Sequence, residues 1–145
     1  HCHTRRQRQM CIRDSSGTGS PTGKMVAKVA NLISDTPRRM EEMQAIANIT
    51  RAGLTALSAG NLEGLGIAMD TCHERLRKLE VSTKKLDRMV NAARPHSLGA
   101  KLTGAGGGGC MVALTQDPAR VSEAIEIAGG RPLQTKLGSK GVRIL

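Results

Sequence analysis

Aromatic residues are missing from this chain altogether: its 145 residues include no Trp, Tyr or Phe. Proteins that bind single-stranded nucleic acid stack bases on aromatic side chains. This chain has a formal net charge of +10 but no aromatic side chain on which a base could stack. The basic residues after position 15 form no continuous tract either. We therefore interpret the charge as solvated helix faces with some attraction for anionic substrates, and we expect no nucleic-acid partner.

The chain also lacks long apolar runs and metal-binding spacings. No apolar stretch is long enough to span a bilayer, so we expect no membrane partner. The four cysteines include no CxxC pair and the four histidines complete no zinc-binding spacing, which predicts no metal site. Reduced thiols are the rule in the cytosol, and we expect a cytoplasmic protein.

Glycine, by contrast, is concentrated in one place. Five of the six residues from Gly104 to Gly109 are glycine, and an apolar strand, Cys110–Thr115, follows directly. Such a run predicts a sharp backbone turn or the close approach of a ligand. Its spacing matches the G-x-G-x-x-G fingerprint of dinucleotide-binding proteins. That fingerprint requires a helix after the loop, whereas a strand follows here, so we reject it.

Apolar residues at helical spacing predict five helices, and cap residues and glycines mark their ends. Helices with short antiparallel strands predict an α+β fold. The expected helices are residues 23–34; 37 to about 59 with Thr36 as N-cap; 62–79 capped by Asn61; 83–94 capped by Ser82; and 118–128 capped by Asp117. Residues 132–137 and 142–145 are expected to form a closing hairpin.

The first fifteen residues differ from the rest. They show no apolar periodicity and contain no apolar core of the length that a signal peptide requires. Their last eight residues, RQMCIRDS, resemble a translated sequencing adapter. We therefore interpret residues 1–15 as a non-native, disordered leader in place of the true upstream coding sequence, and residues 16–145 as the folded domain.

Two segments carry a family resemblance. GAKLTGAGGGGC, residues 99–110, followed by an apolar strand, resembles the third, C-terminal motif of the GHMP small-molecule kinases, and among them the mevalonate kinases of archaea and bacteria. SGTGSPTGKMV, residues 16–26, resembles the turn, Thr and helix that follow an inner strand in these kinases. The resemblance implies the α+β fold of a GHMP kinase C-terminal domain, with helices packed on a small antiparallel sheet.

The chain resembles only the second half of such an enzyme. GHMP kinases are about twice this length, and neither their phosphate-binding loop nor the segment that supplies their catalytic Asp has a counterpart here. The resemblance therefore implies that ATP and Mg2+ are bound mainly by a missing N-terminal half. It also implies that this fragment contains no catalytic residue and is inactive alone.

The resemblance assigns a reaction and roles for individual residues. The reaction is transfer of the γ-phosphoryl group of ATP to the 5-hydroxyl of mevalonate, for isoprenoid synthesis. A homodimer of the full-length enzyme is compatible with this assignment, and no metal ligand is assigned in the chain. The residues implied to bind the substrate are Ser16, Thr22, Lys101 and Thr103. The residues whose backbone would approach the substrate and the transferred phosphate are Gly104, Ala105, Gly106 and Gly107.

Other functions remain open at this point. A sibling kinase acting on phosphomevalonate, galactose or homoserine would carry the same kind of loop. The chain could also be a non-catalytic, basic binding module on the same fold, although such a module has no need for the packed glycines. Within the kinase interpretation, the glycines could form a tight hairpin that only supports the cleft, and Lys101 could be a solvated surface charge.

Overall fold

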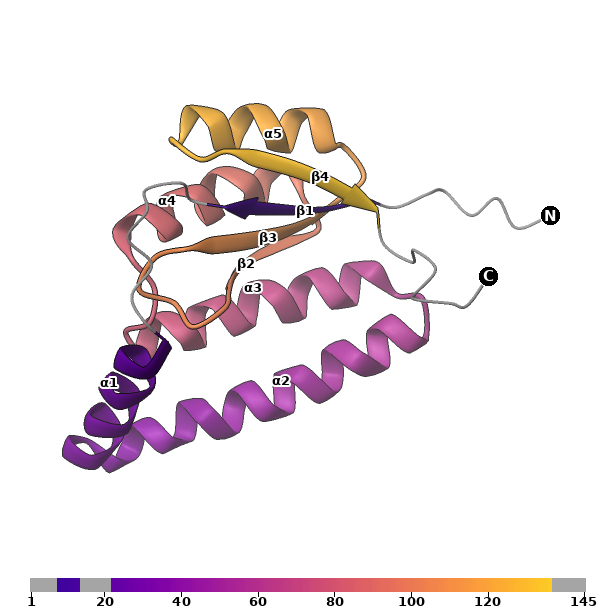
Figure 1. Ribbon diagram of the computed structural model, residues 1–145. Coiled ribbons are helices and arrows are strands. Elements are labelled where there is room, and N and C mark those ends of the chain that lie inside the picture. The colour runs from indigo at the N-terminus through magenta and orange to yellow at the C-terminus, as the bar shows by residue number, and fades with distance from the viewer. Residues whose placement is uncertain (1–7, 14–21, 137–145) are drawn as a thin grey trace, which may run out of the picture.

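Four strands form one antiparallel sheet in the computed structural model, which describes residues 8–13 and 22–136. They are β1 (Arg8–Arg13), β2 (Gly99–Thr103), β3 (Cys110–Thr115) and β4 (Pro132–Lys136). Their order across the sheet is β2-β3-β1-β4, so β2 and β4 are the edge strands (Figure 1). β4 confirms most of the first strand of the expected closing hairpin, whereas residues 137–145 lie outside the described residues.

The five expected helices are all present, each within a few residues of its predicted bounds. Among the described residues, no helix is long and apolar enough to cross a membrane. The helices are α1 (Thr22–Asp35), α2 (Met40–Ser58), α3 (Leu62–Lys78), α4 (Lys84–Ala93) and α5 (Pro118–Ile127). Single turns of 3-10 helix precede α2 at Pro37–Arg39 and follow α4 at Arg94–His96.

Two of the four predicted N-caps are confirmed. Asn61 and Asp117 each accept a hydrogen bond from the backbone amide three residues further on, as a cap requires. Thr36 makes no such bond. The prediction of Ser82 is wrong by one residue, because Thr83 has the extended backbone of an N-cap and its hydroxyl accepts from the α4 amide. The Ser82 hydroxyl donates to a carboxylate of α4 instead.

The hydrophobic core lies between the sheet and the pair α4 and α5, which cover one of its faces (Figure 1). Because the chain has no aromatic residue, aliphatic and methionine side chains fill this space. Each Leu, Ile or Met fully buried in this way contributes about 1.5–3 kcal/mol relative to an exposed position. The fully buried aliphatic and methionine side chains include Leu86, Met89, Val90, Leu102, Met111, Val121 and Ile125.

Helix α3 lies along the edge strand β2, and α2 packs on α3 from the outside (Figure 1). The two backbones meet where α3 passes the start of β2. A Cβ atom built on Gly66 would lie 2.0 Å from the carbonyl oxygen of Leu98, and one on Gly99 would lie 2.1 Å from the carbonyl oxygen of Gly66. Only glycine fits at either position at this distance, so the pair determines how closely α3 approaches the sheet.

The expectation that residues 1–15 are disordered is wrong for residues 8–13, which form β1 between β3 and β4. Met10 pairs with Ala113 and with Gln134, so both sides of β1 are occupied by partners. The physical reason is that a central strand is specified by partners far away in the chain, and local periodicity does not report them. That residues 1–15 are non-native, with a domain from 16 to 145, remains a proposal.

Replacing Cys11 by Pro tests whether β1 belongs to the fold. Cys11 pairs with Val112 on one side and Leu133 on the other, and proline would remove its amide from the sheet. We expect urea denaturation to show a loss of about 3 kcal/mol in the free energy of unfolding. Cys11→Val keeps the amide and should change stability by less than about 1 kcal/mol. An unchanged midpoint for Cys11→Pro would place the segment outside the fold.

A second substitution tests the contact between α3 and β2. Gly66→Ala would push a methyl group into the backbone at Leu98, and we expect a loss of about 3 kcal/mol or more in the free energy of unfolding. The control is Gly23→Ala in α1, where an added Cβ meets no atom within 4 Å and should be neutral or stabilising by up to about 1 kcal/mol. Similar effects of the two variants in thermal melts would contradict the close approach.

Candidate functional site

The loop between β2 and β3 has a backbone that glycine alone adopts readily. Gly104, Gly106, Gly107, Gly108 and Gly109 all have positive φ, between 72° and 134°. For any other residue each such angle would cost about 1–2 kcal/mol. The concentration of glycine seen in the sequence is therefore a requirement of the loop's conformation.

The loop is seated on the connection between α3 and α4. The amide of Gly107 donates a hydrogen bond of 2.8 Å to the carbonyl oxygen of Val81. Gly106 packs so closely on the same group that a Cβ atom there would lie 2.2 Å from that oxygen. Gly106 and Gly107 thus anchor the loop, and the Gly107 amide is already engaged within the protein.

The connection that holds the loop is itself fixed by α1. Glu80, just before Val81, is the one non-glycine residue with positive φ (59°) among the described residues. Lys28 of α1 donates a hydrogen bond of 2.7 Å to the Glu80 carbonyl oxygen, and its ammonium group also lies 3.9 Å from the Glu80 carboxylate. Helix α1, the end of α3 and the glycine loop are therefore joined at one point.

Beside this point lies a hollow of about 380 Å³ that brings together three of the predicted site residues. Thr22, at the start of α1, and Gly104 and Ala105 of the glycine loop all line it. The volume lies in the range typical of small-molecule sites. The remaining lining residues are apolar: Met25, Val26, Val29, Met43, Ile46, Leu76, Leu79 and Val81.

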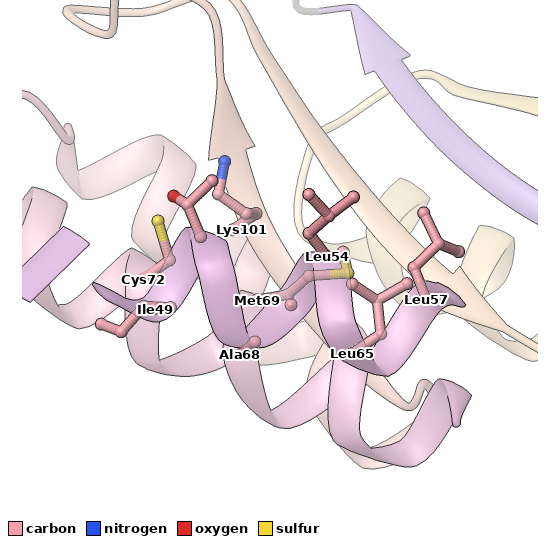
Figure 2. A pocket seen from close by; sticks show the side chains of 10 residues that line it. Ile49, Leu54, Leu57, Leu65, Ala68, Met69, Cys72 and Lys101 are labelled. Carbon is pink, nitrogen blue, oxygen red and sulfur yellow. The ribbon is translucent and has the colours of Figure 1, made fainter. Parts of the chain in front are cut away.

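Lys101 lines a different groove, between α2, α3 and β2. Figure 2 shows Lys101 beside Cys72 at one end of this groove and Leu54, Leu57, Leu65 and Met69 towards the other. The Lys101 ammonium donates a hydrogen bond of 2.8 Å to the carbonyl oxygen of the next residue, Leu102. Burial raises the pKa of the Cys72 thiol, and the nearby Lys101 charge opposes this only in part. The thiol is therefore protonated at neutral pH and unreactive.

Of the remaining two predicted substrate residues, only Thr103 is among the described residues, and it does not line the hollow beside Thr22. Thr103 pairs with Cys110 at the base of the glycine loop and is absent from the lining of either hollow. Ser16 lies outside the described residues.

Backbone amides in the first half of the loop are available to a ligand. No described residue accepts a hydrogen bond from the amides of Gly104, Ala105 or Gly106. Successive amides in a turn with positive φ form concave sites that suit anions such as phosphate. The loop therefore offers N–H donors at the edge of the hollow, whereas the described residues contain no group of three His, Cys, Asp or Glu side chains that could hold a metal ion.

Sequence reasoning missed two polar residues that hold β2 in place. Asp70 and His73 of α3 accept hydrogen bonds from the amides of Ala100 and Leu102, at 2.8 Å and 3.2 Å. They share one face of α3 with Gly66, because residues spaced by four and three positions align on a helix. This Gly-Asp-His spacing was the available signal, but it indicates a function only once the neighbouring strand is known.

Comparison with known proteins adds independent information. Residues 54–131 match the model of the family described as GHMP kinases C terminal. The chain is 38% identical over 137 residues to the mevalonate kinase of Pyrococcus furiosus, covering 89% of this chain and 41% of that protein. The chain thus spans about two fifths of the length of the curated relatives that it matches.

The fold of the chain also matches solved kinase structures. The crystal structure of L. major mevalonate kinase in complex with R-mevalonate matches with a TM-score of 0.75 at 25% identity, covering 93% of this chain and 44% of that one. The structure of Streptococcus pneumoniae phosphomevalonate kinase in complex with phosphomevalonate and AMPPNP has the same TM-score at 19% identity, covering 90% and 40%. At that identity the second match shows the fold alone.

Two alanine substitutions within the loop test its seating on Val81. Gly104 and Gly106 have nearly the same φ, 84° and 83°, so alanine carries the same backbone strain at both. Only at Gly106 would the new methyl group also overlap the Val81 carbonyl. We expect Gly106→Ala to reduce the free energy of unfolding by about 2 kcal/mol more than Gly104→Ala in urea titrations. Equal losses would mean that the loop does not rest on Val81.

Proposed function

The chain belongs to the GHMP kinase family, and we propose that the protein carrying it transfers the γ-phosphoryl group of ATP to the 5-hydroxyl of mevalonate. The observation that carries this proposal is that Thr22, Gly104 and Ala105 line the same hollow. Segments that are about eighty residues apart in the sequence meet there, and both were singled out by their resemblance to these kinases. The identity to the mevalonate kinase of Pyrococcus furiosus supports the choice of substrate.

The hollow fits a small, branched, largely aliphatic acceptor. Its wall of Met, Val, Ile and Leu side chains would hold the carbon skeleton of mevalonate by excluding water, and the Thr22 hydroxyl would form a hydrogen bond with a polar group of it. Thr103, Lys101 and Ser16 stay in the proposal as substrate residues, although Thr103 and Lys101 do not line this hollow and Ser16 lies outside the described residues. Phosphoryl transfer depends mainly on positioning and electrostatic stabilisation, which a preformed wall of this kind serves.

The amides of Gly104, Ala105 and Gly106 fit the phosphate side of the reaction. Gly104 and Ala105 line the hollow, and none of the three amides has an acceptor among the described residues, so the amides of Gly104 and Ala105 can donate to phosphate oxygens there. ATP would supply the phosphoryl group, and Mg2+ would neutralise charge on its phosphates. Because the chain spans only about two fifths of the mevalonate kinase of Pyrococcus furiosus and resembles the second half of such enzymes, we assign the Mg2+ ligands and the catalytic base to the remainder of the protein.

A coupled assay of ADP release tests the proposal. We expect the protein carrying this chain to turn over mevalonate with a kcat/KM at least about 100-fold above that for phosphomevalonate, galactose or homoserine. This ratio corresponds to a difference of about 2.7 kcal/mol in the free energy of transition-state binding. Residues 1–145 alone should show no turnover. A preference for another of these substrates would replace mevalonate by a sibling activity. No ADP release with any of them would favour the non-catalytic binding module.

Thr22→Val provides the matched variant for the substrate pocket. It keeps the size and branching of the side chain and removes only the hydroxyl. We expect KM for mevalonate to rise about tenfold, the cost of one lost hydrogen bond of about 1.4 kcal/mol, with the KM for ATP unchanged. Unaltered kinetics would exclude Thr22 from substrate binding.

A further inference from the structure

Strand β2 is an edge strand whose outward amides are satisfied by side chains. Edge strands present unpaired N–H groups, and proteins commonly cover them with another element. Here α3 covers the edge. Asp70 Oδ1 lies 2.8 Å from the amide nitrogen of Ala100, and His73 Nδ1 lies 3.2 Å from that of Leu102. Both side chains act as acceptors.

The contact with Leu102 requires one particular form of His73. A ring nitrogen that accepts a hydrogen bond carries no proton, so the proton of the neutral ring is on Nε2. Nε2 lies 3.2 Å from Oδ1 of Asp87, which is the acceptor that this proton needs. The His73 side chain is 1% exposed, so water cannot substitute for either partner.

The Asp87 carboxylate is itself held by two other donors. The Ser82 hydroxyl donates to Oδ1 at 2.5 Å and the Arg77 guanidinium donates to Oδ2 at 3.2 Å. The remaining charged groups near the ring are Glu74 on α3 and Arg94 after α4, which are hydrogen-bonded to each other, while β2 contributes Lys101, which bonds the Leu102 carbonyl. The geometry around His73 is therefore fixed from α3, α4 and β2.

We propose that His73 is a positioning residue for the glycine loop. Its neutral imidazole, held by Asp87, accepts a hydrogen bond from the Leu102 amide and so fixes the position of β2 where the strand leads into Gly104. Leu102 is two residues from the loop, and a strand that shifts at this bond carries Thr103 and Gly104 with it. In its catalytic consequence this inference rests on the proposed function. Its structural part concerns β2 alone.

Protonation of His73 would break the arrangement. A second proton on Nδ1 would face the Leu102 N–H, so two donors would oppose each other and the hydrogen bond would be lost. Burial lowers the pKa of His73, and the neighbouring Asp87 charge only partly opposes this. Because the folded pKa lies below the ordinary value of about 6.5, the stabilisation is present above that value and is lost as pH falls towards the folded pKa.

Two conservative variants separate the acceptor from the donor. In His73→Asn, the side-chain oxygen occupies the place of Nδ1 and keeps an acceptor for Leu102 that does not titrate. In His73→Gln, the amide group reaches towards the place of Nε2 and keeps a donor for Asp87, but leaves Leu102 without an acceptor. His96→Asn removes the other histidine of the described residues and serves as the control.

Amide hydrogen exchange of Leu102, read by NMR on the 145-residue chain and corrected for intrinsic rates, is the first measurement. We expect protection of Leu102 in the unsubstituted chain and in His96→Asn to fall at least tenfold as His73 becomes protonated. His73→Asn should remain protected without this pH dependence, and His73→Gln should lack the protection at every pH. If His73→Asn is folded and His73→Gln is unfolded, that result would also support the role of His73 as an acceptor.

Equal behaviour of the two His73 variants, folded or unfolded, would overturn the proposal. The second measurement is the pH profile of kcat/KM for mevalonate in the protein carrying this chain. We expect kcat/KM to decrease at low pH as His73 becomes protonated, through a larger change in KM than in kcat. This decrease should be absent in His73→Asn. If mevalonate is not a substrate, the proposed function fails while the Leu102 measurement still decides the role of His73. A decrease that persists in His73→Asn would refute the catalytic consequence.

Discussion

Helix α3 lies against the edge strand β2 closely enough for its side chains to bond the amides of that strand. Gly66 and Gly99 bring the two backbones so close that neither position has room for a Cβ atom. Only at this separation can short side chains on the helix reach the strand's amides, as Asp70 and His73 do. A wider gap would leave those amides unpaired in the interior, at a cost of about 1–3 kcal/mol each.

The same helix also determines where the glycine loop lies. The loop leaves the strand that α3 holds, and it returns to Val81 at the end of α3, where Gly107 is hydrogen-bonded. Glu80 takes up a left-handed backbone to make that end possible, and Lys28 secures it from α1. One anchor of the loop is therefore the strand that α3 holds, and the other is the connection that directly follows α3, which is how a loop with so many glycines can hold a defined conformation.

The parts of this structure that the sequence could predict are those governed by neighbouring residues. The helices follow from local periodicity, and the caps Asn61 and Asp117 act within one turn. Long-range partners decided the failures. β1 is a strand because β3 and β4 flank it, and His73 acquires a role only from Leu102, which is distant in sequence. The Ser82 prediction is a local exception, because its hydroxyl donates to nearby Asp87 while Thr83 caps the helix.

Two of the predicted substrate residues, Thr22 and Lys101, line different hollows. Side chains alternate along a strand, and since Leu102 is buried in the core, Lys101 projects from the opposite face of β2, into the groove with Cys72. The hollow beside Thr22 is consequently lined by one hydroxyl, backbone groups and apolar side chains, with no charged residue among the described lining. Phosphoryl transfer requires stabilisation of charge. In the proposed reaction the described lining of this hollow therefore provides shape, amide donors and exclusion of water.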